Sequence, residues 1–247
     1  MKRIVFLILA SVLGGHLCAQ TDAATTLTDS SSVETRETCR VPGNSIGQFN
    51  WAAMAGVGFS TVRAKSNSEI SSNFLIGKKS TVNYRVGALV DYTCYANLFL
   101  EGGLFFQHKG YRIVNELGGE DEEDYSVRLY YLHVPLSANY RFSIEKIWLA
   151  PQLGPYFDVA LFGKQKGFER NEGVKKDYNE DIFDDIHKDT YRRFDCGILI
   201  GLNGFFKNYR VGMEFDLGIV NMYKKVLGTQ PEIRHTTFSF NFAYYFR

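Results

Sequence analysis

The most reactive side chains in this sequence are a histidine, several carboxylates and a serine that alternate with apolar residues. His133 with Asp158 or Glu214 would form a general-base pair, and Ser137 would be the nucleophile beside it. Such catalysis requires the three groups to be gathered at one place, commonly where a strand ends. The sequence has no compact Ser/His/acid grouping at a strand end, so we expect no catalytic residues and no enzyme.

A dense acidic run is a second candidate site. It consists of Glu120, Asp121, Glu122, Glu123 and Asp124. Carboxylate oxygens are the ligands that hard divalent cations prefer, so the run is a candidate surface cation site. It lacks the spacing of a dedicated calcium loop, and a solvated, self-repelling segment is the alternative interpretation.

The cysteines suggest no metal site. Beyond residues 1–19 the chain has Cys39, Cys94 and Cys196, and none has the CxxC or Cys/His spacing of a zinc site. We therefore expect no metal and no other cofactor. A disulfide between Cys39 and Cys94 is a hypothesis that suits an oxidising compartment.

A larger set of charged residues lies at every second position of segments whose other positions are apolar. The set is Arg85, Asp91, Glu101, His133, Arg141, Asp158, Arg193, Asp195, Arg210, Glu214 and Asp216. Alternate side chains of a β-strand point to opposite faces, so these residues would share one face. If that face lines a narrow interior the charges must pair, because an isolated buried charge is very costly. We expect an ion-pair network that fills the interior, with a gated ion path as the alternative.

Eight segments carry this alternation. They lie at about 51–60, 84–93, 98–107, 130–142, 147–161, 193–206, 209–219 and 235–247. In the last, aromatic residues stand at every second position from Phe238 to Phe246. Each segment is long enough to cross a bilayer when tilted, which takes roughly 9–11 residues.

The connections between these segments alternate between short and long. Tight turns are expected at 94–97, 143–146 and 207–208, and long polar loops at 61–83, 109–126, 163–191 and 221–234. Bacterial outer-membrane barrels have short periplasmic turns and longer extracellular loops. We therefore predict an all-β fold, an eight-stranded antiparallel up-and-down transmembrane β-barrel over residues 49–247, with periplasmic termini and four extracellular loops.

The N-terminal residues are typical of an exported protein. Lys2 and Arg3 precede an apolar run from Ile4 to Leu13, and the small Ala19 precedes Gln20. We predict a signal peptide over residues 1–19 and a flexible periplasmic lead-in over 20–48. A lipoprotein with its lipid on Cys18 is the alternative.

A secreted lipocalin-like barrel is the main rival fold. Its cavity would be lined by the apolar face, with the charged face in water. Glycines argue against it, since a crowded lumen needs small residues on the polar face and a solvated surface does not. The glycines on that face are Gly56, Gly58, Gly87, Gly103, Gly197, Gly201, Gly212 and Gly218.

Several motifs are similar to those of a known family. Residues 131–136 read Y-L-H-V-P-L and residues 139–142 read N-Y-R-F, which resembles a strand of the PorT-type outer-membrane barrels of the porin family. Residues 153–156, 194–197 and 237–246 resemble its later strands, so the resemblance covers about residues 49–247. It implies the barrel fold. The namesake's role in type IX secretion and surface translocation is not implied for this chain, and Arg247 departs from the family's terminal aromatic residue.

The expected function is that of a non-enzymatic outer-membrane protein with surface-exposed loops, acting in structure, in interaction or as an accessory of export. Its expected partners are outer-membrane lipid and lipopolysaccharide, the barrel-assembly machinery, and an extracellular or periplasmic protein. A formal net charge of +1 and the lack of a basic patch exclude nucleic acid. A narrow pore for small solutes or ions and a lipid-modifying enzyme are the alternatives.

Overall fold

The computed structural model describes residues 46–65, 78–95, 97–118, 121–144, 147–171, 174–183, 191–223 and 232–246. The predicted signal peptide and nearly all of the predicted lead-in lie outside these ranges. Within the described ranges, no helix is long and apolar enough to cross a membrane.

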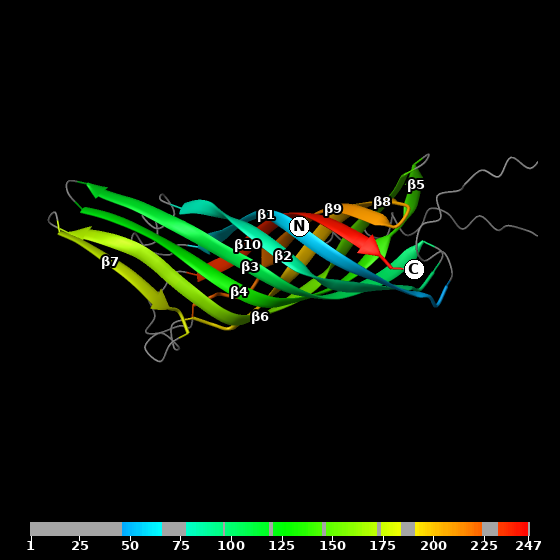
Figure 1. Ribbon diagram of the computed structural model, residues 1–247, viewed down its shortest axis with the longest axis horizontal. Coiled ribbons are helices and arrows are strands. Elements are labelled where there is room, and N and C mark those ends of the chain that lie inside the picture. Colours follow the sequence, from blue (N-terminus) through cyan, green and yellow to red (C-terminus); the bar gives the residue numbers. More distant parts are fainter. Residues whose placement is uncertain are drawn as a thin grey trace, which may run out of the picture. The chain divides into compact units, whose positions relative to one another are not determined.

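Ten strands make up the described part of the chain. They are β1 (Phe49–Lys65), β2 (Lys78–Thr93), β3 (Leu98–Gly118), β4 (Asp121–Tyr140), β5 (Phe142–Ile144), β6 (Ile147–Asn171), β7 (Val174–Asp181), β8 (Phe194–Phe206), β9 (Tyr209–Gly218) and β10 (Glu232–Tyr245). Eight of them form a ring of antiparallel neighbours, which closes where β1 pairs with β10 and β4 pairs with β6 (Figure 1). The predicted eight-stranded up-and-down barrel is therefore confirmed. Strands β5 and β7 are additions that both pair with β6.

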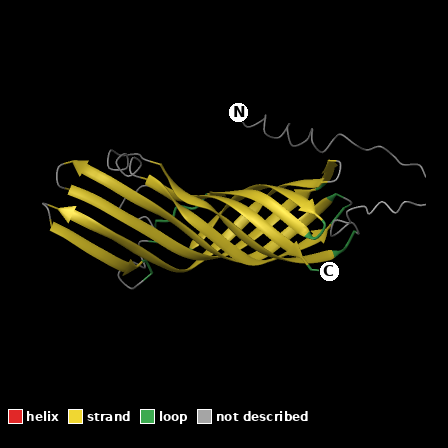
Figure 2. Ribbon diagram, turned by 45° about the horizontal axis from the view of Figure 1, so that its top comes forward, coloured by secondary structure: helices red, strands yellow, loops and turns green. Residues whose placement is uncertain are grey.

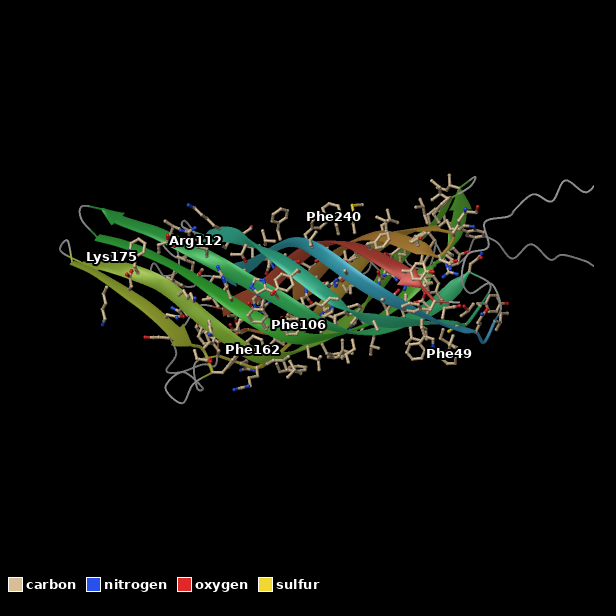
Figure 3. All side chains as sticks on the ribbon, viewed as in Figure 1. Phe49, Phe106, Arg112, Phe162, Lys175 and Phe240 are labelled. Atoms are coloured by element: carbon tan, nitrogen blue, oxygen red, sulfur yellow. The ribbon has the colours of Figure 1, made fainter. Side chains whose placement is uncertain are left out.

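The outer surface of the barrel is apolar. In β9 the side chains alternate strictly between exposed apolar residues, such as Val211 and Met213, and buried polar ones, such as Arg210 and Glu214. Figure 3 shows Phe49 and Phe240 on the outside of the wall. A belt of this extent far exceeds the apolar patches that water-soluble monomers expose. The lipocalin-like arrangement, with its apolar face inward, is excluded.

The two ends of the barrel differ, and we name them by their connections. The turn end carries the tight connections after β2, β5 and β8; the hairpin end is the opposite one. At the hairpin end the interior is filled by an apolar group, here called the hairpin-end cluster. It comprises Val62, Tyr111, Ile113, Val127, Leu129, Tyr131, Ala160, Ile182, Tyr191, Met222 and Ile233. Several of these come from connecting segments that fold inward, and Met222 is fixed by a backbone hydrogen bond to Ile233.

Two of the four predicted long loops are largely strand, so their prediction as loops was wrong. Residues 109–118 continue β3 and pair with β4 as far as Gly118 opposite Asp121. Residues 163–171 continue β6 and pair with β7. Both extensions lie beyond the apolar belt, where neither face meets lipid. Their backbones remain paired, but the alternation of apolar residues that marks a spanning strand is lost because no lipid selects for it.

These extensions form one continuous sheet, here called the projecting sheet. Its strands follow the order β3, β4, β6 and β7, with Glu122 of β4 opposite Arg170 of β6. Figure 2 shows these strands continuing past the rest of the barrel at the hairpin end. Within the described residues β7 pairs only with β6, so it is the open edge of this sheet.

Candidate functional site

The structure places the predicted interior charges inside the barrel, with one exception. Ten of the eleven are each at most 4% exposed. They are Arg85, Asp91, Glu101, His133, Arg141, Asp158, Asp195, Arg210, Glu214 and Asp216. The exception is Arg193, whose predicted inward position was wrong: its side chain is exposed and its guanidinium lies 4.5 Å from the centre of the Phe183 ring.

The interior charges gather into two groups. The turn-end group is built around Glu101 of β3 and Arg210 of β9. Arg210 donates to both carboxylate oxygens of Glu101, the Nη2–Oε1 distance being 3.1 Å, and its Nε donates to Asn203 Oδ1 at 3.0 Å. Two parallel bonds between a guanidinium and a carboxylate are the strongest form of such a pair.

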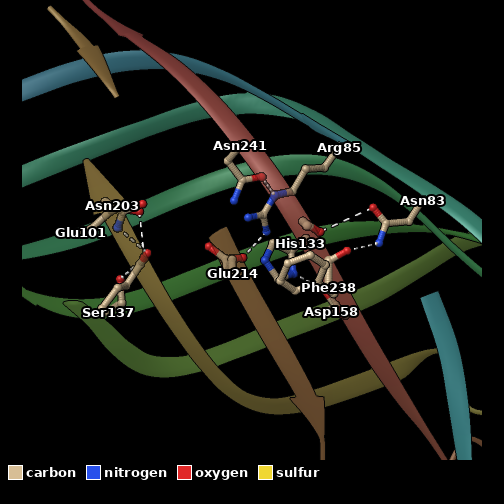
Figure 4. Close-up of polar contacts among 12 residues, drawn as sticks. Asn83, Arg85, Glu101, His133, Ser137, Asp158, Asn203, Glu214, Phe238 and Asn241 are labelled. Carbon is tan, nitrogen blue, oxygen red and sulfur yellow. Dashed lines mark hydrogen bonds and ion pairs between the residues drawn. The ribbon is translucent and has the colours of Figure 1, made fainter. Parts of the chain in front are cut away.

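Neutral polar side chains extend the turn-end group. Gln152 Nε2 donates to Ser137 Oγ at 2.8 Å and to Glu101 Oε1 at 3.1 Å, while Asn203 Nδ2 donates to Gln152 Oε1 at 2.8 Å (Figure 4). Ser137 therefore belongs to this group. No hydrogen bond between Ser137 and His133 exists among the described residues, so the considered nucleophile–base pair is not assembled.

Aromatic rings surround the remaining charges of the turn-end group. The Tyr245 hydroxyl donates to Asp91 Oδ2 at 2.6 Å. Arg141 lies 4.0 Å from the same carboxylate, and its guanidinium is 4.2 Å from the centre of the Phe99 ring. A cation over an aromatic face is stabilised by the ring quadrupole, most strongly where water is excluded.

The central group lies closer to the hairpin end. His133 of β4 is hydrogen-bonded through Nδ1 to Asp158 Oδ1 at 2.7 Å, and Lys109 Nζ donates to Asp158 Oδ2 at 2.6 Å. Arg85 forms an ion pair with Glu214 and donates from Nε to Asn241 Oδ1 at 2.9 Å (Figure 4). The structure thus brings His133 and Asp158 together, but no hydroxyl or thiol of a described residue is hydrogen-bonded to His133.

Lys109 is a member of this group that the sequence analysis missed. It was counted in a polar loop, whereas the structure buries it completely against Asp158. The signal was present, because positions 99, 101, 103, 105 and 107 point inward and continuing the alternation places residue 109 inward as well. Its ammonium also lies 4.6 Å from the centre of the Tyr156 ring.

The predicted surface sites are only partly within the described residues. Of the acidic run, Glu120 lies outside them, whereas Asp121, Glu122, Glu123 and Asp124 form the start of β4. Asp124 is paired with Arg112 across the β3–β4 hairpin. The cation site there remains a prediction. Cys39 also lies outside the described residues, so the Cys39–Cys94 disulfide remains a prediction. Cys94 is half-buried beside the β2–β3 turn and forms no disulfide with another described residue.

The Arg112–Asp124 pair predicts a pH dependence of the projecting sheet. Arg112 Nε donates to Asp124 Oδ1 at 2.7 Å, and this bonding holds the pKa of Asp124 below its ordinary value. A carboxyl whose pKa is lowered on folding stabilises the hairpin above its unfolded pKa, and this contribution disappears as the pH falls through the lowered value. Because Arg112 is half-exposed, the pair contributes only about 0.2–1 kcal/mol.

We expect a carbon-detected NMR titration of Asp124 in micelles to show a midpoint below that of an ordinary aspartate. In Arg112→Leu the midpoint should move upward. An unchanged midpoint in that variant would show that Arg112 does not stabilise the ionised carboxylate.

One family model and several solved structures match this chain. The sequence profile described as "Outer membrane protein beta-barrel domain" matches residues 19–223. No curated protein matches the chain. Similar solved structures include Ail, the attachment invasion locus protein of Yersinia pestis (13% identity, 82% of this chain and 100% of that chain, TM-score 0.32). OprG from Pseudomonas aeruginosa is 11% identical over 84% of this chain and 100% of that chain, with a TM-score of 0.40. Outer membrane protein W of E. coli is 17% identical over 83% and 100%, with a TM-score of 0.38.

Proposed function

The chain belongs to the outer membrane protein beta-barrel domain family and is an integral outer-membrane protein, and from this premise we propose that it is a closed barrel that acts through its projecting sheet. The function that this supports is that of a non-enzymatic structural or interaction protein. The motifs at residues 131–142 support PorT-type membership, which stays part of the proposal.

The filled interior supports a closed barrel. The lumen of an eight-stranded barrel is just wide enough for side chains to occupy it. Here the largest fully buried side chains come from several depths: Phe99 and Tyr245 at the turn end, Arg85 in the middle, and Tyr111 at the hairpin end. The charged side chains bind one another across the lumen and thus occupy the path that a solute would take.

The projecting sheet is the part of the barrel available to a partner outside the membrane. Its edge strand β7 exposes Lys175, Lys176 and Asp177, and Figure 3 shows Lys175 at this end of the barrel. An open edge offers unpaired backbone groups, and charged side chains along it limit indiscriminate strand addition. The main support for the proposal is that the paired strands continue beyond the apolar belt. Functional surfaces concentrate on segments that a rigid scaffold holds in place, and the projecting sheet is such a segment.

The lengths of the connections support one orientation in the membrane. Outer-membrane barrels place short turns in the periplasm and longer connections outside the cell. The projecting sheet would then lie outside the cell, where the exposed lysines of β6 and β7 are available to the phosphates of lipopolysaccharide or to an acidic protein surface.

We expect Lys175→Cys in a cysteine-free background to react with a membrane-impermeant maleimide on intact cells. Lys207→Cys, in the tight turn between β8 and β9, is the matched control and should react only after the outer membrane is permeabilised. The opposite pattern would reverse the orientation and refute an extracellular projecting sheet.

We also expect the folded protein to give no unitary current steps in planar bilayers, because side chains fill its lumen. Reproducible steps that disappear when the sample is boiled would overturn the closed barrel and favour a narrow pore.

A further inference from the structure

The centre of the lumen holds three side chains of metal-ligating type close together. His133, Glu214 and Asp216 each present a ligand atom, and these atoms all lie within 4.8 Å of one another. They come from β4 and β9, which are not neighbours in the ring, so the grouping is formed across the lumen. We propose that this is a binding site for one divalent transition-metal ion, of the Zn²⁺ or Mn²⁺ type.

The orientation of His133 matches that of a metal ligand. Its Nδ1 is hydrogen-bonded to Asp158, whose other oxygen accepts from Lys109. This arrangement places the Nδ1 proton toward the carboxylate and leaves the lone pair of Nε2 free. Metal-bound histidines characteristically have such a carboxylate on the other ring nitrogen, since it fixes the tautomer and increases the basicity of the ligating atom.

Unpartnered polar atoms provide an independent indication. His133 Nε2 and both carboxylate oxygens of Asp216 are buried and have no hydrogen-bond partner among the described residues. The two side chains belong to residues that are 0% and 1% exposed. A buried polar atom without a partner destabilises the fold, and a cation bound between His133 and Asp216 would give these atoms a partner.

The lumen has more buried carboxylates than buried basic side chains, which is compatible with a bound cation. Its buried cationic side chains are Arg85, Lys109, Arg141 and Arg210, and its buried carboxylates are Asp91, Glu101, Asp158, Asp195, Glu214 and Asp216. Each cation lies within ion-pair distance of one carboxylate, which leaves Asp195 and Asp216 without an ion pair in the described lumen. A divalent ion balances this excess. Glu214 can contribute because a carboxylate has two oxygens, one for Arg85 and one for the ion.

The ligand set selects the class of metal. Ca²⁺ and Mg²⁺ prefer all-oxygen sites, whereas an imidazole nitrogen combined with carboxylates suits Zn²⁺, Mn²⁺ and related ions. Tetrahedral zinc with bonds of roughly 2.0–2.2 Å has its ligands about 3.4 Å apart, so the side chains would close inward by about 1 Å. Because the hairpin-end cluster covers the site, the ion would enter while the barrel folds and would exchange slowly afterwards.

The test is elemental analysis of the full-length barrel, refolded with Zn²⁺ or Mn²⁺ and then washed with EDTA. The wild type should retain one ion per chain and release it on boiling. His133→Gln and Asp216→Asn should retain none. His108→Gln, a histidine stacked on Tyr84 at the outer wall, and Asp91→Asn, a lumen carboxylate in the turn-end group, should retain the ion.

Two further measurements distinguish loss of the metal site from misfolding of the variants. Refolding with Co²⁺ should give visible absorption bands in the wild type and the two controls, but not in correctly folded Asp216→Asn. Zn²⁺ should raise the unfolding midpoint of the wild type and leave that of Asp216→Asn unchanged. A folded wild type without a stoichiometric ion under all three metals would overturn the proposal, as would site variants that retain the ion.

Discussion

Gly58→Ala is expected to prevent the barrel from closing. Gly58 lies in β1 opposite Ser239 of β10, at the pairing that joins the first strand to the last. A Cβ atom at position 58 would lie 1.9 Å from the Phe238 carbonyl oxygen and 2.7 Å from the Ser239 Cα. Both are backbone atoms of the paired strand, so no change of rotamer relieves the clash, and the strands must separate where their hydrogen bonds close the ring. Overpacking of this kind ordinarily costs about 1–3 kcal/mol, and more where the backbone itself must move.

The measurement is the yield of the folded form, which migrates differently from the boiled protein on a gel, after refolding in detergent or lipid. Gly58→Ala should give little or none of this form. Gly204→Ala in β8 is the matched control, because a Cβ there would meet nothing closer than 3.7 Å and should be tolerated. Equal yields for the two variants would show that β1 and β10 adjust more freely than their close approach implies.

Arg210→Leu is expected to be the most destabilising change among the lumen charges. It would leave Glu101, which is 3% exposed, without the guanidinium that binds both its oxygens, and would remove the bond to Asn203. Breaking a buried pair by removing one partner costs about 3–5 kcal/mol, because the remaining charge is uncompensated. The double variant Glu101→Leu/Arg210→Leu removes both charges and should recover much of the loss.

Unfolding in urea, followed by the same gel assay in lipid vesicles, gives the free energies. Arg112→Leu is the control, since its half-exposed pair with Asp124 should contribute only about 0.2–1 kcal/mol. If Arg210→Leu cost no more than this control, the lumen pairs would not be desolvated as the structure indicates. If the double variant were no better than Arg210→Leu, the contacts of Arg210 with its neutral neighbours would account for the loss.

The alternation of apolar and polar residues predicted most of the barrel. It identified every spanning strand and placed Arg85, Glu214 and Asp216 on the inner face, because lipid outside and a crowded lumen inside impose opposite demands on successive positions. It failed where that contrast ends. Residues 110–118 and 121–126 of the β3–β4 hairpin lie beyond the lipid, so their polar outer face was mistaken for a loop. Lys109 was counted in that loop although its side chain points into the lumen. Arg193 lies just before β8, where the chain no longer follows the strand's alternation.

The partners within the lumen could not be predicted from the sequence. Glu101 and Arg210 are 109 residues apart and meet only because of the tilt and stagger of the strands around the ring. The convergence of His133 with Glu214 and Asp216 has the same origin. A pattern read along one strand gives the face on which a residue lies but not its depth relative to residues across the barrel.

The pairing of β1 with β10 has a consequence for the order of events during synthesis. Every residue from Ala52 to Lys65 has its partner between Glu232 and Tyr245, so the contacts that close the ring are among the most distant along the chain. Contacts of such sequence separation form slowly, because a long loop must be ordered first. Until β10 arrives, β1 has an unpaired edge that hydrocarbon cannot satisfy. A chain interrupted before β10 should therefore remain outside the bilayer as a target for proteolysis, and insertion should be completed only by the last strand to be made.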